Sequence, residues 1–351
     1  MPYEWDSLLD LSAFDQFFSE VFETNQVTAG DLLKRIVNGE EILNRDLIFK
    51  LIKCVLFQDM DSLKTMFLFV LGILLMETVV RCFCQIFEKK ELEELSSYFF
   101  WMLLLGVLLE NYIKTSVIAT ESWNQVLTFM KMLAPAYLIS VGSITGVSTA
   151  TCFYQLLLLL LGLIDTVLIG ACIPAIHIFV MMICMDTLLG GEQFQDLEEL
   201  LEKGIIWGMK IAFTMMTGIG FVKGILAPVE GSINHALLQK TLGVIPGIGN
   251  ISNTITSAMT GSALLIKNTL GGFALCILIL LTILPVCKIG CIALIMKITG
   301  AIGGVFGKNR LAKSTIRISD GCFLLARLTF SMNALCFLVI AMTAYTTNVS
   351  L

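Results

Sequence analysis

Residues 244–288 read VIPGIGNISNTITSAMTGSALLIKNTLGGFALCILILLTILPVCK, and this stretch determines how the chain is interpreted. It is apolar enough to enter a bilayer. It nevertheless carries a proline–glycine break at Pro246 and Gly247, and the charged Lys267 followed by Asn268. A charged side chain at the centre of a bilayer costs at least ~3 kcal/mol. We therefore expect the stretch to line a protein interior or an aqueous path rather than to face lipid.

The composition around this stretch predicts an all-α polytopic membrane protein. The chain has 351 residues, of which 56% are hydrophobic and 15% charged, and its mean hydropathy is +0.86. Soluble domains carry about 25% charged residues, and several apolar runs here reach the ~20 residues that a membrane helix needs. The formal net charge of −5 gives no basic surface for nucleic acid. The lipid bilayer is therefore an expected partner and nucleic acid is not.

The apolar runs predict about eight transmembrane helices after a small amphipathic helical region at residues 1–64. The transmembrane domain is expected to occupy residues 65–351. Its predicted helices lie at 65–87, 97–115, 153–171, 174–190, 204–222, 263–284, 286–304 and 320–345. Two further apolar segments, 132–147 and 242–258, are interrupted by Pro135 and Pro246, and each is either a re-entrant hairpin or a bent span. If both cross the membrane, the number of spans is ten.

The spacing of the prolines indicates a possible internal repeat. Pro135 and Pro174 are 39 residues apart, and so are Pro246 and Pro285. The offset of 111 residues defines possible repeats at 97–207 and 208–318, with chance similarity of apolar sequence as the alternative. Many transporters have two similar halves, with the site near the repeat interface.

The basic residues predict the orientation of the chain. Four of them lie between residues 308 and 317, and three more lie between 81 and 90. Because Lys and Arg favour cytoplasmic loops, we expect both regions inside, and the N-terminus and C-terminus to be extracytoplasmic. The acidic loop 191–203 does not fix its own side, because acids carry little topological weight.

Polar residues within the apolar helices are the candidates for function. Glu77 and Arg81 are four residues apart and can pair along one helix face, either as a self-neutralised pair or as part of a polar path. Asp165 lies deep in an apolar helix, where a carboxylate is costly unless it is protonated or has a partner.

The polar group of the opening stretch completes the candidate set. Lys267 either extends its amine to the membrane interface, or reaches a carboxylate such as Asp165 or the backbone carbonyls freed by the break at Pro246. Asn268 and Thr269 can bond across helices. The candidates for a polar pathway or for helix packing are Lys267, Asn268, Thr269, Pro246, Gly247, Gly249, Asp165, Glu77 and Arg81.

Catalytic and metal-binding motifs are absent from the sequence. There is no HExxH, GxSxG or P-loop, and the 11 cysteines form neither a CxxC pair nor a Cys/His cluster with zinc spacing. We therefore expect a non-enzymatic protein with no cofactor and no metal.

Several of these motifs resemble the stage III sporulation protein AE family of endospore-forming Firmicutes. The similarity rests on IPGIGN (245–250), then LLIKNTLGG (264–272), then Pro285 and Lys288. The amphipathic segment 28–57 is similar to the segment that precedes the first span in that family. The resemblance covers most of the chain.

The resemblance implies a function that composition does not reveal. Members of the family are encoded in the stage III A operon and reside in the outer forespore membrane. With the ATPase and ring-forming products of that operon, and indirectly with stage II sporulation protein Q, they would form a secretion-like channel complex between mother cell and forespore. The implied role is a membrane subunit of this complex. The alternatives are a stand-alone secondary transporter of small solutes and a non-conducting membrane scaffold.

Overall fold

The computed structural model describes residues 15–16, 60–145, 147–189, 193–242, 249–305 and 310–349. Side chains are described within these ranges except at 141, 143–149, 152, 153, 156, 165, 220–268 and 343–349. Apart from residues 15–16, most of the expected N-terminal region 1–64 lies outside the described residues, as do Pro246 and Gly247.

The described residues form long helices and contain no strand, which confirms the all-α prediction. In chain order the elements are α4 (Met60–Ile86), α5 (Lys90–Thr145), α6 (Val147–Leu163), the π-helix η2 (Ile164–Cys172), α7 (Ile173–Leu189), α8 (Gln195–Leu242), α9 (Gly249–Val305) and α10 (Arg310–Val349).

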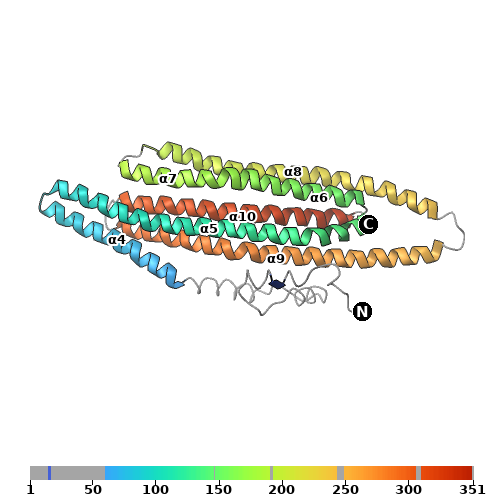
Figure 1. Ribbon diagram of the computed structural model, residues 1–351. Helices are drawn as coiled ribbons and strands as arrows, with labels where there is room; N and C mark the ends of the chain where they lie inside the picture. Colours follow the sequence, from blue (N-terminus) through green and yellow to red (C-terminus); the bar gives the residue numbers. More distant parts are fainter. Residues whose placement is uncertain are drawn as a thin grey trace.

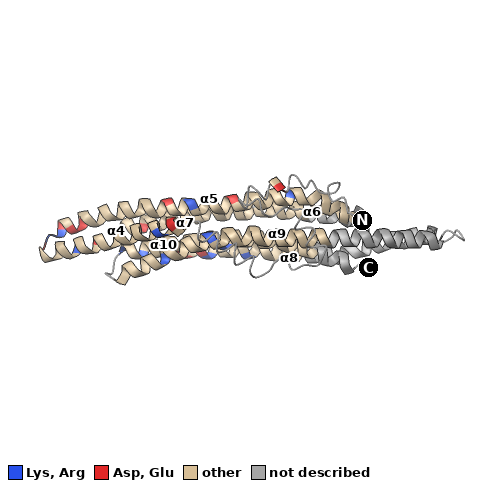
Figure 2. Cartoon of the chain, turned by 90° about the horizontal axis from the view of Figure 1, so that it is seen from below, with Lys and Arg blue, Asp and Glu red and all other residues tan. Residues whose placement is uncertain are grey.

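The helices lie roughly side by side in an elongated bundle (Figure 1). α9 has 57 residues, which is about 85 Å at 1.5 Å per residue and far more than the ~30 Å of a bilayer core. The turns that join α4 to α5, α7 to α8 and α9 to α10 lie at the same end of the bundle (Figure 1), which we call the loop end. Residues of both charge signs occur there (Figure 2).

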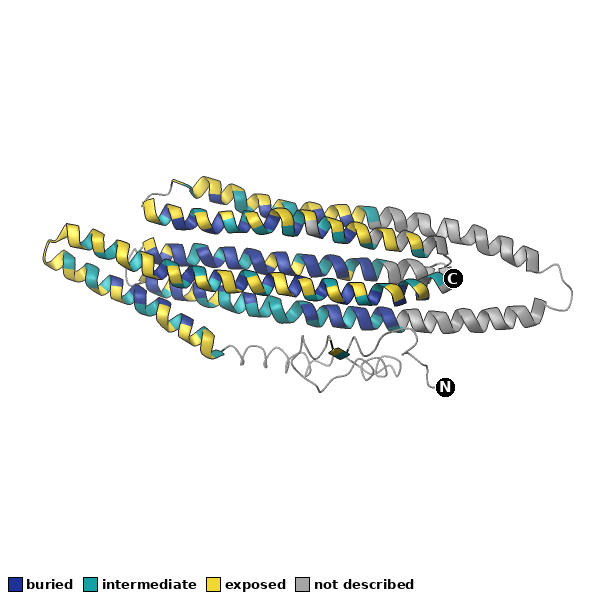
Figure 3. Cartoon of the chain, viewed as in Figure 1, coloured by how far each residue is buried: buried dark blue, intermediate teal, exposed yellow. Residues whose placement is uncertain are grey.

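α10 is the central helix of the bundle. It packs against α9, α5, α8 and α7. In its most apolar window 61% of the residues are buried, against 17–39% in the other candidate spans. Large apolar side chains on the outer helices are instead exposed, among them Phe69, Phe99 and Trp207, and the exposed residues follow the outer surface in Figure 3. This distribution fits a bundle whose outside faces lipid.

Five described helical stretches are long and apolar enough to cross a membrane. They are Met60–Ile86, Lys90–Ser140, Leu157–Leu189, Thr269–Val305 and Arg310–Met342. The membrane character of the chain is thus supported, whereas the number of eight or ten spans stays a prediction. The repeat at offset 111 also stays a prediction, because Pro246 lies outside the described residues.

The expected helix boundaries at the prolines are wrong in three places. The segments 263–284 and 286–304 form one helix, α9, which continues through Pro285. The segments 97–115 and 132–147 lie almost entirely in α5, which continues through Pro135. Residues 153–171 and 174–190 are joined by η2 without a turn. A proline inside a helix removes one backbone hydrogen bond and its ring crowds the carbonyl four residues earlier, but packing against neighbouring helices can hold the helix together across such a site.

The π-helix has a local cause in Pro174. Proline lacks an N–H, and its ring collides with the carbonyl four residues earlier, here that of Gly170. A wider turn avoids this collision. The N–H of Ile173 accordingly bonds to the carbonyl of Leu168, five residues back, which is the π-helical pattern.

Candidate functional site

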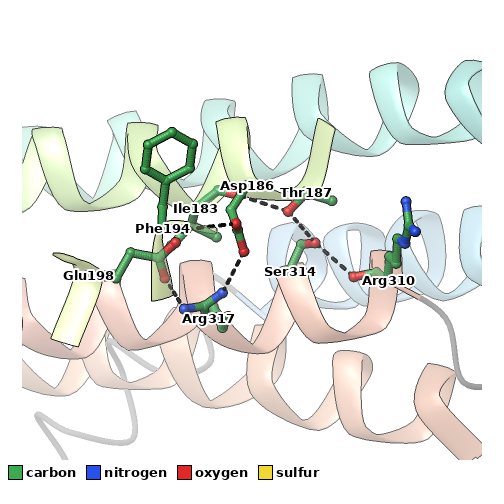
Figure 4. Close-up of polar contacts among 8 residues, drawn as sticks. All are labelled: Ile183, Asp186, Thr187, Phe194, Glu198, Arg310, Ser314 and Arg317. Atoms are coloured by element: carbon green, nitrogen blue, oxygen red, sulfur yellow. Dashed lines mark hydrogen bonds and ion pairs between the residues drawn. The ribbon is translucent and has the colours of Figure 1, made fainter. Parts of the chain in front are cut away.

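A buried group of charged side chains joins three helices near the loop end. Arg317 of α10 places Nη1 3.2 Å from Oδ2 of Asp186 on α7, and its Nη2 forms an ion pair with Glu198 on α8. The side chains of Asp186 and Glu198 are only 6% and 2% exposed. We call these three residues the Arg317 cluster (Figure 4).

The ends of α7 and α8 bring the two carboxylates together. Asp186 lies in the last turn of α7, and Glu198 lies in the first turn of α8. The N–H of Phe194, in the connection between the helices, donates to Oδ1 of Asp186 at 3.1 Å, and the N–H of Glu198 donates to the carbonyl of Phe194 at 2.9 Å. A carboxylate is favoured by the helix dipole at the start of α8 and disfavoured at the end of α7. The hydrogen bond from Phe194 and the ion pair with Arg317 are therefore the main stabilisation of the Asp186 carboxylate.

A hydroxyl pair lies beside the cluster. The Oγ atoms of Thr187 and Ser314 are 2.7 Å apart and link α7 to α10. Each hydroxyl is also hydrogen-bonded to its own helix, Thr187 to the carbonyl of Ile183 at 2.7 Å and Ser314 to that of Arg310 at 2.8 Å. The Thr187–Ser314 contact fixes the register between α7 and α10 next to the ion pairs.

The electrostatics of the cluster centre on Glu198. Burial raises the pKa of its carboxyl to about 7, with Arg317 acting to lower it and Asp186 acting to raise it. Two carboxylates share one guanidinium, so the cluster carries one net negative charge when both are ionised and none when one is protonated. The arrangement can therefore hold and release a proton near neutral pH. Within the described residues, no group of three His, Cys, Asp or Glu side chains is placed to hold a metal ion.

The predicted ion pair between Glu77 and Arg81 is present on α4. Arg81 donates a hydrogen bond to Oε1 of Glu77, and the two form an ion pair. The Glu77 side chain is 2% exposed, against 26% for Arg81. The pair lies towards the loop end of α4, one turn from Leu74, which is close to Gly303 of α9.

The other candidates belong to different elements or lie outside the described residues. Lys267, Asn268 and Thr269 lie in α9. Thr269 is half-buried, and it is 34 residues from Gly303, or about 50 Å along the helix. Asp165 lies in η2, which packs against α6, α7, α8 and α10, whereas α9 packs chiefly against α10, α5 and α4. The suggested contact between Lys267 and Asp165 stays a prediction, because neither side chain belongs to the described residues. Gly249 begins α9, and the side chains at Asp165, Lys267 and Asn268 lie outside the described residues.

Sequence reasoning missed the Arg317 cluster. Asp186 and Arg317 are 131 residues apart, and each stands beside a predicted loop, where solvated charges are expected. One signal was present: an acidic loop at 191–203 and a basic loop at 308–317. Charges of opposite sign on two loops of the same face can pair, but the sequence alone did not place the two loops on one face.

Comparison with known proteins gives a consistent result. A family model described as stage III sporulation protein AE matches residues 27–347. The stage III sporulation protein AE of Bacillus subtilis (strain 168) is 24% identical over 237 residues, which cover 66% of this chain and 59% of that relative. The alignment thus spans less than two thirds of the relative's length. No solved structure matches the chain. Since the family model covers nearly all of it, the chain belongs to the stage III sporulation protein AE family.

Proposed function

We propose that the protein is a non-enzymatic membrane subunit of a channel complex that joins mother cell and forespore during endospore development. The observation that carries the proposal is family membership over residues 27–347 in a chain with five helical stretches able to cross a membrane. The proposed location is the outer forespore membrane. By the distribution of basic residues, the loop end faces the cytoplasm and both termini are extracytoplasmic.

The proposed partners are other products of the stage III A operon, including the ATPase and the ring-forming subunits, with stage II sporulation protein Q as an indirect partner. A buried charge cluster that determines which helices meet suits a subunit that must keep one defined arrangement within a larger assembly. In this proposal the polar stretch around Lys267, Asn268 and Thr269, with the break from Pro246 to Gly249, lines or braces a polar passage.

Genetic replacement tests the proposal. In an endospore-forming bacterium whose own stage III AE gene is replaced by this one, we expect late forespore gene expression and co-purification of the other stage III A products from detergent-solubilised membranes. Loss of the gene with no effect on late forespore expression would overturn the proposal, as would a protein that never co-purifies with those products.

A single substitution tests the role of the polar stretch. Lys267→Ala is expected to reduce late forespore expression while membrane abundance stays normal. Lys297→Ala is the matched control, because Lys297 lies on the same helix in an exposed ion pair with Asp320 at 2.7 Å. Full activity of the Lys267→Ala protein would remove Lys267 from the mechanism and leave the complex membership intact.

A non-conducting scaffold is the second candidate function. The favouring observation is that α10, the most buried candidate span, fills the centre of the bundle. Reconstitution separates the candidates. Passage of a solute only in the presence of the other operon products supports the channel subunit, and no passage with any combination supports the scaffold. Uptake by the purified protein alone in liposomes would favour a stand-alone secondary transporter.

A further inference from the structure

A cavity of about 380 Å³ lies where α4, α5 and α9 meet. α4 crosses the bundle obliquely (Figure 1). Midway along α4, Leu74 is close to Gly303 of α9, and the first two turns of α4 supply Ser62 and Met66 to the cavity wall. We call this cavity the α4–α5–α9 pocket. Its volume falls within the range of ligand sites, about 300–1,000 Å³.

The wall of the pocket is amphiphilic. Its charged lining residues are Lys114 of α5 and Lys288 of α9, and among the residues that the structure describes no acidic one lines it. Ser62 and Asn111 add neutral polar groups, and the rest of the wall is apolar. Ammonium groups bind phosphate as point charges. The pocket therefore matches a molecule with a phosphate at one end and an apolar body.

The surroundings favour a membrane lipid over a soluble phosphate compound. Ile113 and Val117 line the pocket and are 58% and 48% exposed. On the neighbouring helices, Leu68 and Leu294 are also exposed. Such a surface belongs against acyl chains, and lysines beside it can hold the phosphate of an anionic lipid headgroup.

The ion pair of Lys114 does not block this role. Its Nζ is 2.7 Å from Oε1 of Glu110, and the two side chains are 59% and 65% exposed. Exposed pairs of this kind contribute little net free energy. Lys114 can therefore take a phosphate oxygen as an additional or alternative partner.

We propose that the α4–α5–α9 pocket binds an anionic phospholipid, with its phosphate between Lys114 and Lys288 and an acyl chain along Ile113 and Val117. Because α4 packs chiefly against α5 and α9, the lipid joins the N-terminal half of α4 to the bundle. The proposal is independent of the channel role, since it concerns a ligand of the chain itself.

Native mass spectrometry and thermal unfolding of the full chain in detergent test the proposal. Phosphatidylglycerol is expected to be retained and to raise the unfolding temperature more than phosphatidylcholine does. The Lys114→Ala/Lys288→Ala variant is expected to lose about tenfold or more in phosphatidylglycerol affinity, while Lys297→Ala on the same α9 retains it. Equal binding of phosphatidylcholine, or an unchanged double variant, would overturn the proposal.

Two further measurements separate a lipid from a soluble phosphate compound and provide a second variant of the pocket. Free glycerol 3-phosphate is expected to give no thermal shift, and a shift equal to that of the lipid would assign the pocket to soluble phosphates instead. If the double lysine variant does not fold, Ile292→Trp fills the pocket and leaves both lysines in place. This variant should also lose phosphatidylglycerol, and normal binding by a folded Ile292→Trp protein contradicts the proposed site.

Discussion

At the scale of the residue, Arg317 joins α10 to both α7 and α8, a connection that no sequence motif predicted. It faces a carboxylate from each of two other helices. A buried ion pair adds little net stability over a well-packed apolar equivalent, because desolvation offsets the attraction, but removing one partner leaves an uncompensated buried charge. The Arg317 cluster is therefore expected to determine which helices meet more than how tightly they are held.

Substitution of Arg317 tests this expectation. Arg317→Ala leaves Asp186 and Glu198 buried without a counter-charge, so the free energy of unfolding should fall by about 3–5 kcal/mol. The measurement is thermal or denaturant unfolding of purified protein in detergent. Arg310→Ala, at an exposed position on the same helix, should change little. Replacing all three cluster residues by Leu or Met should recover most of the loss, and the absence of recovery would argue against an electrostatic cause.

The raised pKa of Glu198 predicts a pH dependence of stability. Its carboxyl has an ordinary pKa of 4.5 and a folded-state pKa of about 7 because of burial. Between these values the folded state keeps a proton that the unfolded state releases. The contribution of this bound proton to the free energy of unfolding is therefore complete below about pH 4.5 and is lost as the pH rises through 7. From pH 5 to 8, the free energy of unfolding of the wild type should decline relative to that of Glu198→Gln, because only the wild type carries the titrating carboxyl. Parallel pH profiles of the two proteins would contradict the assignment.

At the scale of the element, glycines set how closely the helices approach. A Cβ atom built on Gly321 of α10 would lie 2.5 Å from Cγ2 of Val180 on α7. Valine is stiff at its first side-chain torsion and cannot turn aside easily. A Cβ atom on Gly300 of α9 would likewise lie 2.8 Å from Cγ1 of Ile316 on α10. Small residues at such crossings permit the close packing that holds helices together in lipid.

Gly321→Ala should therefore destabilise the bundle by about 1–3 kcal/mol through overpacking. Gly290→Ala on α9 is the control, because a Cβ atom there has no neighbour within 4 Å, and it should be neutral or slightly stabilising. Val180→Ala combined with Gly321→Ala should be more stable than the sum of the single effects. Strict additivity in this double-mutant cycle would show that the two residues do not compete for space.

At the scale of the whole molecule, the helices alternate in direction and return three times to the loop end (Figure 1). The acidic start of α8 and the basic start of α10 lie there together, as Arg317 and Glu198 demonstrate. The sequence left open which side the loop 191–203 occupies. The described part of this loop, 193–203, lies at the same end of the bundle as residues 81–90 and 310–317.

Cysteine accessibility tests this arrangement. The starting protein is a variant lacking the 11 native cysteines. Single cysteines introduced at Lys90, Gln195 and Lys313 should then be either all labelled or all protected when a membrane-impermeant thiol reagent is added. Protection of all three in intact cells is the outcome expected for a cytoplasmic loop end, and a cysteine at Asp61 is expected to be labelled. Labelling of Gln195→Cys from outside while Lys90→Cys is protected would contradict the common loop end.

Prediction from sequence succeeded where the signal was local. The apolar runs predicted membrane helices, and the spacing of Glu77 and Arg81 predicted their ion pair, because both depend on neighbours within a turn or two. It failed at Pro135 and Pro285, since whether a helix survives the loss of one hydrogen bond depends on its packing. The candidates Lys267, Asn268 and Asp165 stay predictions, because their side chains lie outside the described residues.

The sequence by itself determined the class of the protein: a helical membrane protein of the stage III sporulation AE family, with seven of its 23 basic residues in the two regions 81–90 and 308–317. Hydropathy and short motifs suffice for this, because helix formation and insertion into lipid are set by consecutive residues. The tertiary structure alone decided that Arg317 meets Asp186 and Glu198, that Gly321 lies against Val180, and that Lys114 and Lys288 share a pocket. These partners come from different helices, and apolar helices in lipid pack through shape and polar contacts that no single helix encodes.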